Sequence, residues 1–189
     1  MAEFGVVVAV LQKDTVLLTK REDFDVWCLP GGAVDPREAV DRAAVREVFE
    51  ETGLQVQLTH YVGLLHKPLW GRDGAQISLF AARPMSTTFN PNPAEVQALA
   101  YYPVGQLPEP IFWEHRHLIM AAHSGVTGHV WVNRVQTPPL FANRAELYAW
   151  RDNSGLSRYA AYQQLMQQVG PQTLEIILGP HAGARLTEG

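Results

Sequence analysis

The sequence predicts an α+β domain followed by a shorter, mainly helical segment. Two kinds of pattern predict this class. Apolar, β-branched runs recur between turn residues, which is typical of strands. Other segments carry apolar residues at helical spacing between marked start and stop signals, which is typical of helices. The segment 137–140, Thr-Pro-Pro-Leu, interrupts both patterns, and we expect it to separate a domain of residues 1–136 from an extension of residues 137–189.

Composition excludes several classes of protein. The 189 residues are 47% apolar and 18% charged, which is a globular rather than a disordered composition. The net charge of −4 offers no basic surface for duplex nucleic acid. Cys28 is the single cysteine, so an internal disulfide is excluded and a reducing compartment is favoured. Glu3 and the short apolar run 6–11 fit neither a signal peptide nor a membrane span. We therefore expect a cytoplasmic protein with no membrane segment.

The first elements are two strands and a glycine turn. The run from Val6 to Leu11 is continuous and β-branched, which predicts a strand buried on both faces. After a turn at 12–14, a second strand is predicted from Val16 to Arg21. The pair Gly31–Gly32 then allows the backbone to turn sharply or to approach a ligand closely.

A helix with marked ends is predicted next. Asp35 is a good N-cap, Pro36 suits the first helical position, and Glu38 completes a capping box. Gly53 is the expected stop, in the left-handed conformation that a side chain would resist. Apolar residues recur between these ends at helical spacing, namely Ala39, Val40, Ala43, Ala44 and Val48.

The rest of the domain is predicted to be mostly strand. Strands are expected at 56–65, 76–82, 98–102 and 129–135, with a helix at 114–123.

The extension is predicted to contain two helices. Asn143 and Glu146 form a second capping box, which opens a helix through Trp150. Another helix is expected at 157–169, followed by a short apolar stretch at 174–178 and a loose tail from Gly179. A segment of this size is marginal for a core of its own, so we expect it to pack on the first domain or at a dimer interface.

Three glutamates carry the functional prediction. On a helix, Glu47, Glu50 and Glu51 gather on one side of the last turns. Like charges at this spacing, near the end of a helix that disfavours anions, suggest that a cation offsets them. Carboxylates without nearby His or Cys suit Mg²⁺ or Mn²⁺ rather than zinc. The competing interpretation is a solvated acidic face with Arg46 as its ion-pair partner.

The full pattern around these glutamates is more specific. Residues 32–54 match G-x5-E-x7-R-E-U-x-E-E-x-G-U at every position, where U is apolar. This pattern is the Nudix box, and the chain strongly resembles a Nudix hydrolase. The order of elements from Phe4 to about Val135 is also similar to the α/β/α sandwich of that family, with its mixed sheet. The extension lies outside the resemblance.

The resemblance implies hydrolysis of the diphosphate linkage of a nucleoside diphosphate derivative, by attack of water on phosphorus. Glu47, Glu50 and Glu51 would hold the divalent ions, helped by a backbone carbonyl of Gly31 or Gly32. Arg46 would orient the carboxylates, and Glu38 would serve the structure. Family members take their general base either from the box or from a later loop. Glu95 is the best loop candidate here, as metal ligand or base, and otherwise it is a solvated acid.

Substrate recognition is less well marked. Pro68 falls fifteen residues after Gly53, where a proline marks ADP-ribose-type members of the family. Arg72 is a candidate for a phosphate contact, and Trp70 and Phe24 are candidates for stacking on a base. Packing or solvation is the competing interpretation for each of the three.

We therefore expect a small-molecule nucleotide substrate, with ADP-ribose or another nucleotide sugar slightly favoured. One alternative is a house-cleaning pyrophosphatase that acts on nucleoside triphosphates. Another is a non-catalytic nucleotide sensor, although a sensor has no need of all three metal-binding glutamates. The resemblance is also compatible with a homodimer.

Overall fold

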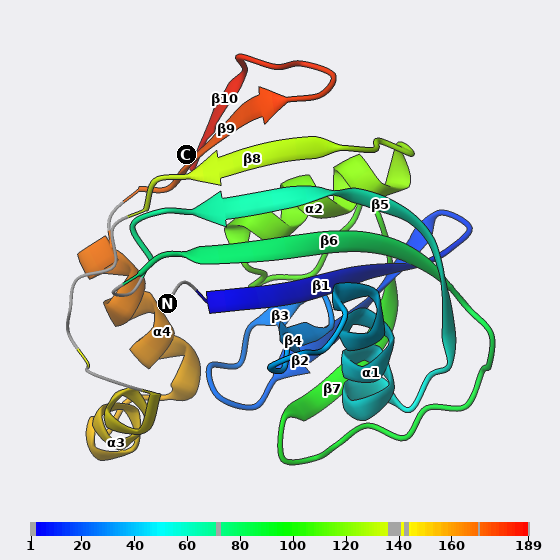
Figure 1. Cartoon of the computed structure of the whole chain (residues 1–189). Coiled ribbons are helices and arrows are strands. Elements are labelled where there is room, and N and C mark those ends of the chain that lie inside the picture. The colour runs from blue at the N-terminus through cyan, green and yellow to red at the C-terminus, as the bar shows by residue number, and fades with distance from the viewer. Residues whose placement is uncertain (1–2, 71–72, 136–140, 142–143, 170, 189) are drawn as a thin grey trace.

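The computed structural model describes residues 3–70, 73–135, 141, 144–169 and 171–188 (Figure 1). The strands of the first part are β1 (Glu3–Gln12), β2 (Thr15–Arg21), β3 (Trp27–Cys28), β4 (Gly31–Ala33), β5 (Val56–Lys67), β6 (Ala75–Pro84), β7 (Val96–Pro103) and β8 (His129–Asn133). Its helices are α1 (Val40–Thr52) and α2 (Trp113–His123). The rest contributes α3 (Arg144–Asn153), α4 (Arg158–Val169), β9 (Thr173–Leu178) and β10 (Arg185–Thr187).

The strands form one mixed sheet. Its order is β10-β9-β8-β5-β6-β1-β2-β3, with β4 paired to β1 and β7 paired to β2. The pairs β1–β6 and β5–β8 are parallel, whereas the other pairs are antiparallel. Helix α1 lies on one side of the sheet and α2 on the other (Figure 1). The predicted α+β class with a mixed sheet between helices is confirmed.

Strand β1 supplies both hydrophobic cores. Val6, Val8 and Val10 pack with the apolar face of α1, whereas Val7 and Ala9 pack on the opposite side with α2. None of these five residues is more than 8% exposed. Because alternate residues of a strand point to opposite faces, a run without polar interruptions fits a strand covered on both sides. The prediction for this strand is confirmed.

The start of α1 differs from the prediction, whereas its end agrees. The helix begins at Val40, after Ala39, rather than at Pro36. Arg37 has a φ of 69°, which is incompatible with a continuous right-handed helix. The N–H of Asp35 still donates to Glu38 Oε2 at 3.1 Å, so half of the predicted capping box forms, but it closes a separate turn. At the other end, Gly53 is left-handed as predicted, and its N–H donates to the carbonyl of Phe49.

The last part of the chain corrects the expectation of a loose tail. Strand β9 pairs with β8, and β10 pairs with β9, so both extend the sheet of the predicted first domain. Leu174 and Ile176 of β9 are buried in the α2 core, which explains why this stretch is ordered as a strand. The two helices of the extension are present, and the first continues past Trp150 to Asn153. The linker 137–140 and Asn143 lie outside the described residues, and the boundary at residue 136 stays a prediction.

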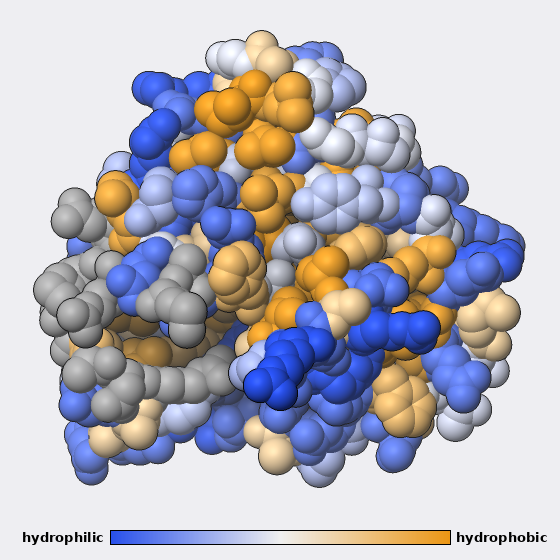
Figure 2. Space-filling view, in the orientation of Figure 1, coloured by the Kyte–Doolittle hydropathy of each residue, from blue (hydrophilic) through white to orange (hydrophobic). Residues whose placement is uncertain are grey.

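The surface is unevenly polar. In the view of Figure 2, apolar side chains gather over β9 and β10, where Ile177 and Leu178 are 51% and 59% exposed, while hydrophilic side chains cover much of the region over α1. Within the described ranges, no helix is both long and apolar enough to cross a membrane.

Candidate active site

Gly31 and Gly32, predicted as a glycine turn and called so below, begin strand β4 and lie against the last turns of α1. The N–H of Gly31 donates to Glu51 Oε2 at 3.2 Å. A Cβ on Gly31 would lie 2.1 Å from the carbonyl oxygen of Val6, and a Cβ on Gly32 would lie 2.5 Å from Glu47 Oε2. Both separations are shorter than van der Waals contact. Gly31 therefore needs to be glycine, because the backbone of β1 cannot give way, whereas a side chain at Gly32 would displace the carboxylate of Glu47.

Arg46 connects the remaining acids of this region. Its Nε and Nη2 donate to the two oxygens of Glu38, each at 2.8 Å. Its Nη1 donates to Glu47 Oε1 at 2.8 Å and to Glu50 Oε2 at 3.0 Å, and Nη2 also reaches the carbonyl of Ala33 at 3.0 Å. The hydrogen bonds from Arg46 hold the pKa of Glu38 at about 2. One guanidinium therefore fixes three carboxylates relative to the turn.

Two of the carboxylates are poorly compensated. Burial raises the pKa of Glu51 to about 8, and this effect exceeds the opposite effects of the Gly31 N–H and the charge of Arg21. Burial also raises the pKa of Glu47, against the hydrogen bond from Arg46. Glu50 is different, because 52% of its side chain is exposed. A bound cation would favour the charged forms of Glu47 and Glu51.

Glu95 lies in the same region. It precedes β7, and its charge raises the pKa of both Glu47 and Glu51 further. A hollow between the end of α1 and the loop that joins β6 to β7 contains both Glu50 and Glu95 in its wall. Its lining residues are Phe49, Glu50, Gly53, Asn90, Pro91, Asn92, Pro93 and Glu95. The structure thus brings the loop glutamate that the sequence analysis selected to the glutamates of the helix.

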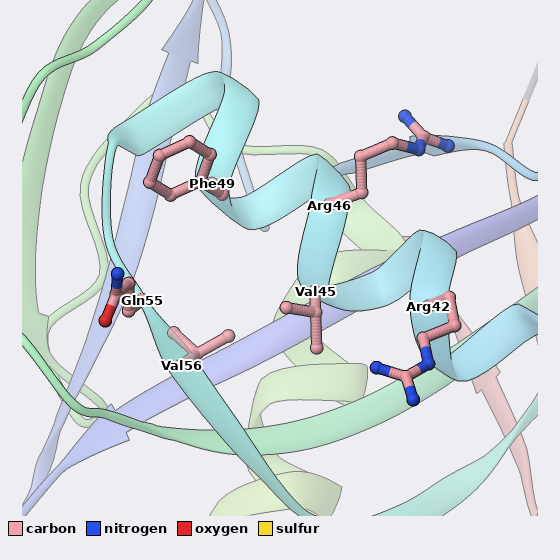
Figure 3. A pocket seen from close by; sticks show the side chains of 6 residues that line it. All are labelled: Arg42, Val45, Arg46, Phe49, Gln55 and Val56. Carbon is pink, nitrogen blue, oxygen red and sulfur yellow. The ribbon is translucent and has the colours of Figure 1, made fainter.

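A second hollow lies on the outer face of α1 and is unrelated to the carboxylates (Figure 3). It is lined by Arg42, Val45, Arg46, Phe49, Gln55 and Val56. Val45, Phe49 and Val56 border this hollow, while the guanidinium of Arg46 points away from it. Because no carboxylate lines it, we do not assign it to the metal-dependent chemistry.

Among the described residues, no group of three or more His, Cys, Asp or Glu side chains is arranged so that the side chains alone could hold a metal ion. The site nevertheless fits a hard divalent ion. Arg46 bonds Glu47 Oε1, while Glu47 Oε2 faces Gly32, where a Cβ would fill the space. The available donors are carboxylate and backbone oxygens, and Mg²⁺ binds through one or two carboxylates while keeping several waters.

Two of the three predicted substrate contacts, Phe24 and Trp70, lie within the described residues. Phe24 is 7% exposed and packs against Tyr162, with ring centroids 6.1 Å apart, so it takes the packing role instead of offering a face to a base. Trp70 is partly exposed, and Lys67 Nζ lies 4.1 Å from the centroid of its ring. Arg72 lies outside the described residues.

One residue near the site was missed by the sequence analysis. Arg21 lies at the end of β2, and its charge lowers the pKa of Glu51. Its Nε donates to Asp23 Oδ1 at 2.8 Å, and its Nη2 donates to Asp23 Oδ2. The segment Lys20-Arg21-Glu22-Asp23 has the ordinary composition of a polar strand end, so no sequence signal distinguishes Arg21.

Comparisons with known proteins agree with this geometry. The NUDIX domain model matches residues 1–122. A putative 8-oxo-dGTP diphosphatase from Bacillus subtilis (strain 168) is 44% identical over 62 residues, which is 33% of this chain and 42% of that protein. Diphosphoinositol polyphosphate phosphohydrolase 3-alpha from Mus musculus is 40% identical over 57 residues, or 30% and 35% of the two chains. The matched segments therefore span less than half the length of these relatives.

Solved structures share the fold. A MutT NUDIX hydrolase from Burkholderia pseudomallei has a TM-score of 0.58 at 25% identity, covering 64% of this chain and 98% of that one. An ADP-ribose pyrophosphatase from Streptococcus suis has a TM-score of 0.57 at 25% identity, covering 66% and 92%. Since the family model matches well over half of the residues, and the glutamates of the motif meet the glycine turn as described, the chain belongs to the NUDIX domain family.

Proposed function

We propose that the protein is a metal-dependent hydrolase that cleaves the diphosphate linkage of a nucleoside diphosphate derivative, by attack of water on phosphorus. The observation that carries this proposal is the packing of two motif carboxylates, those of Glu51 and Glu47, against Gly31 and Gly32. Burial raises the pKa of Glu51 to about 8, because its partners supply too little positive charge. A divalent ion would supply that charge and would also attract the phosphates of a substrate.

In this proposal Glu47, Glu50 and Glu51 hold Mg²⁺ or Mn²⁺, together with the carbonyl of Gly32 or Gly31. The ion, when bound, neutralises phosphate charge and makes a water a stronger nucleophile near neutral pH. Arg46 orients Glu47 and Glu50 while its bonds to Glu38 and Ala33 anchor its own position.

The general base is proposed to be either a glutamate of the helix or Glu95. Glu95 is supported by its electrostatic effect on Glu47 and Glu51 and by its place beside Glu50 in the wall of the hollow. A base must be within reach of the attacking water, directly or through one intervening water. The variant Glu95→Gln tests the second option. If Glu95 is the base, kcat should fall and lose the part of its pH dependence that Glu95 causes. If Glu95 only holds the metal, kcat should also fall, but added Mg²⁺ should restore part of it.

Two substrate classes are supported by different observations. Pro68 and the likeness to the ADP-ribose pyrophosphatase structure favour ADP-ribose or another nucleotide sugar. The 44% identity over 62 residues to the putative 8-oxo-dGTP diphosphatase favours a nucleoside triphosphate. We give the nucleotide sugar slight preference. A purely sensing role is disfavoured because all three glutamates of the motif are present in the sequence, and two of them, Glu47 and Glu51, lie against Gly32 and Gly31.

The deciding experiment is hydrolysis of a panel containing ADP-ribose, other nucleotide sugars, dinucleotides and triphosphates, with Mg²⁺ or Mn²⁺. The enzyme is compared with Glu51→Gln and with Glu109→Gln, a control that alters an acid paired with Arg116 away from the site. We expect metal-dependent turnover that is lost in Glu51→Gln and kept in the control. AMP plus a sugar phosphate identifies the first substrate class, and a nucleoside monophosphate plus pyrophosphate identifies the second. Metal-independent turnover, or full activity of Glu51→Gln, would refute the assignment.

A further inference from the structure

The helices α3 and α4 hold the loop between β2 and β3 (residues 22–26), which lies beside them in Figure 1. Tyr148 Oη donates to Asp23 Oδ2 at 3.0 Å, and Arg151 Nη1 donates to the carbonyl of Asp23 at 2.9 Å. Arg158 of α4 binds both the carbonyl and the carboxylate of Glu22. Asp23 and Arg151 are each only 7% exposed, so these bonds are largely shielded from water.

The same loop is connected to the candidate active site in two ways. The carboxylate of Asp23 receives two hydrogen bonds from Arg21, and the charge of Arg21 acts on Glu51. The neighbouring N–H of Glu22 donates to the carbonyl of Glu95 at 2.9 Å. The loop therefore contacts α3 and α4 on one side. On its other side it holds the guanidinium of Arg21, whose charge acts on Glu51, and it binds the backbone carbonyl of Glu95.

The guanidinium of Arg21 has an alternative to its bond with Asp23, because Glu51 is an acid that it could turn toward. A bidentate arginine–aspartate pair fixes the plane and direction of the guanidinium. Tyr148 and Arg151 in turn hold the side chain and the backbone of Asp23. Outer partners of this kind commonly orient the groups that make direct contact in a metal site.

We propose that α3 and α4 position the active site, with Tyr148 and Arg151 as positioning residues. Both hold Asp23, and through Asp23 they orient Arg21 and the adjoining backbone of Glu22, whose N–H binds the carbonyl of Glu95. This inference rests on the proposed function for its kinetic consequences. It assigns a catalytic support role to a segment beyond residues 1–122, which the family model does not include. Neither helix needs to touch the substrate for this role.

The kinetic test is a double-mutant cycle. Tyr148→Phe removes one hydroxyl and keeps the ring, and Tyr159→Phe is the matched control, since Tyr159 stacks on Tyr162 within α4. We expect Tyr148→Phe to lower kcat about 3- to 10-fold with KM nearly unchanged, a range typical of mutations that act through connected residues. In an Arg21→Gln background the same substitution should change kcat less than about twofold, because its pathway is already broken.

A second measurement does not depend on turnover. Amide exchange at Glu22, followed by NMR, reports the bond from its N–H to Glu95. We expect faster exchange in Tyr148→Phe and in Arg151→Gln, and wild-type exchange in Tyr159→Phe.

The outcomes separate this inference from the proposed function. An equal loss of kcat with and without Arg21 would show a general structural effect and overturn the inference, as would unchanged exchange at Glu22 in both variants. An inactive wild type would count against the proposed function, and the exchange experiment would still decide whether α3 and α4 position Glu95.

Discussion

Glu114 and Glu51 are both shielded from water, but they differ in the groups that compensate their charge. Glu114 of α2 is 8% exposed, and Lys67 Nζ lies 2.5 Å from its Oε1, with Asn133 Nδ2 3.4 Å from its Oε2. Burial alone would raise the pKa of Glu114, but the charges of Lys67 and His115 and the hydrogen bond from Lys67 together outweigh it, and the pKa is lowered. Glu51 is less buried, yet burial raises its pKa to about 8 because its partners are weaker.

The difference between these sites indicates their roles. The chain supplies its own cation for Glu114, so this pair is complete and belongs to the packing of α2 on the sheet. For Glu51 the chain supplies a backbone N–H and a more distant arginine, so the charged form needs a further cation. A perturbed carboxylate whose compensation is incomplete is a candidate functional group, whereas a compensated one is a structural group.

Breaking the complete pair should have the largest effect on stability. Lys67→Met leaves Glu114 buried without its cation, which typically costs about 3 to 5 kcal/mol. Urea unfolding measures this loss, and activity should fall only as far as the folded fraction does. The double variant Lys67→Met/Glu114→Leu should recover most of the stability, because it removes the stranded charge. A single variant as stable as wild type would contradict the interpretation of this pair.

For Glu51, whose charge is incompletely compensated, removing the charge should stabilise the folded protein. The pKa of Glu51 rises from 4.5 to about 8 on folding, so metal-free protein should lose stability as pH increases from about 4.5 to about 8. Glu51→Gln lacks this titration and should be more stable than wild type at pH 8, by up to roughly 3 kcal/mol, and similar to it at pH 4.

Unfolding in a chelator, with and without added Mg²⁺, measures the difference. Mg²⁺ should narrow the gap, because it stabilises the charged carboxylate of the wild type. A wild type whose stability relative to Glu51→Gln does not change with pH would show that the pKa of Glu51 is not raised.

Displacing the carboxylate of Glu47 should reduce activity. Gly32→Ala places a Cβ about 2.5 Å from Glu47 Oε2, so the carboxylate must move away from the turn. We expect kcat/KM to fall about 10- to 100-fold, the range for disturbed metal-site geometry. Gly105→Ala is the control, since nothing lies within 4 Å of a Cβ there. Equal activity of the two variants would mean that Glu47 does not need this position.

The smallest effect is expected for Arg46→Lys. Lysine keeps the positive charge but loses the fork that binds both oxygens of Glu38 while reaching Glu47 and Glu50. We expect kcat to fall by about tenfold or less, with a higher Mg²⁺ concentration needed for half-maximal activity. Arg42→Lys on the same helix is the matched control. An unchanged metal requirement in Arg46→Lys would argue against an orienting role.

The features that could be predicted are those set by the spacing of residues that are close together in the sequence. The buried β1 follows from an uninterrupted apolar run, and the grouping of Glu47, Glu50 and Glu51 near the end of α1 follows from helical spacing. The predicted start of α1 was wrong for two reasons. Asp35 and Glu38 form the same hydrogen bond in a turn as in a helix, and Arg37 adopts a left-handed conformation.

The rest depends on contacts between distant segments. Burial of Phe24 against Tyr162 and capture of Asp23 by Tyr148 join residues more than a hundred positions apart. Likewise, the apolar stretch at 174–178 becomes a strand because β8 presents an edge to it. Such contacts leave no local periodicity, so single-sequence patterns do not predict them.

The pairing of β9 with β8 also affects the tendency of the protein to aggregate. Without residues 173–187, β8 would end the sheet with unpaired backbone groups beside Trp131, and an open edge of that kind can recruit another copy into an aggregate. In the intact sheet the edge is β10, a three-residue strand whose Arg185 binds Glu175 across the hairpin. A short edge that carries charge resists the addition of a foreign strand, so the last hairpin protects this edge of the sheet from pairing with another copy.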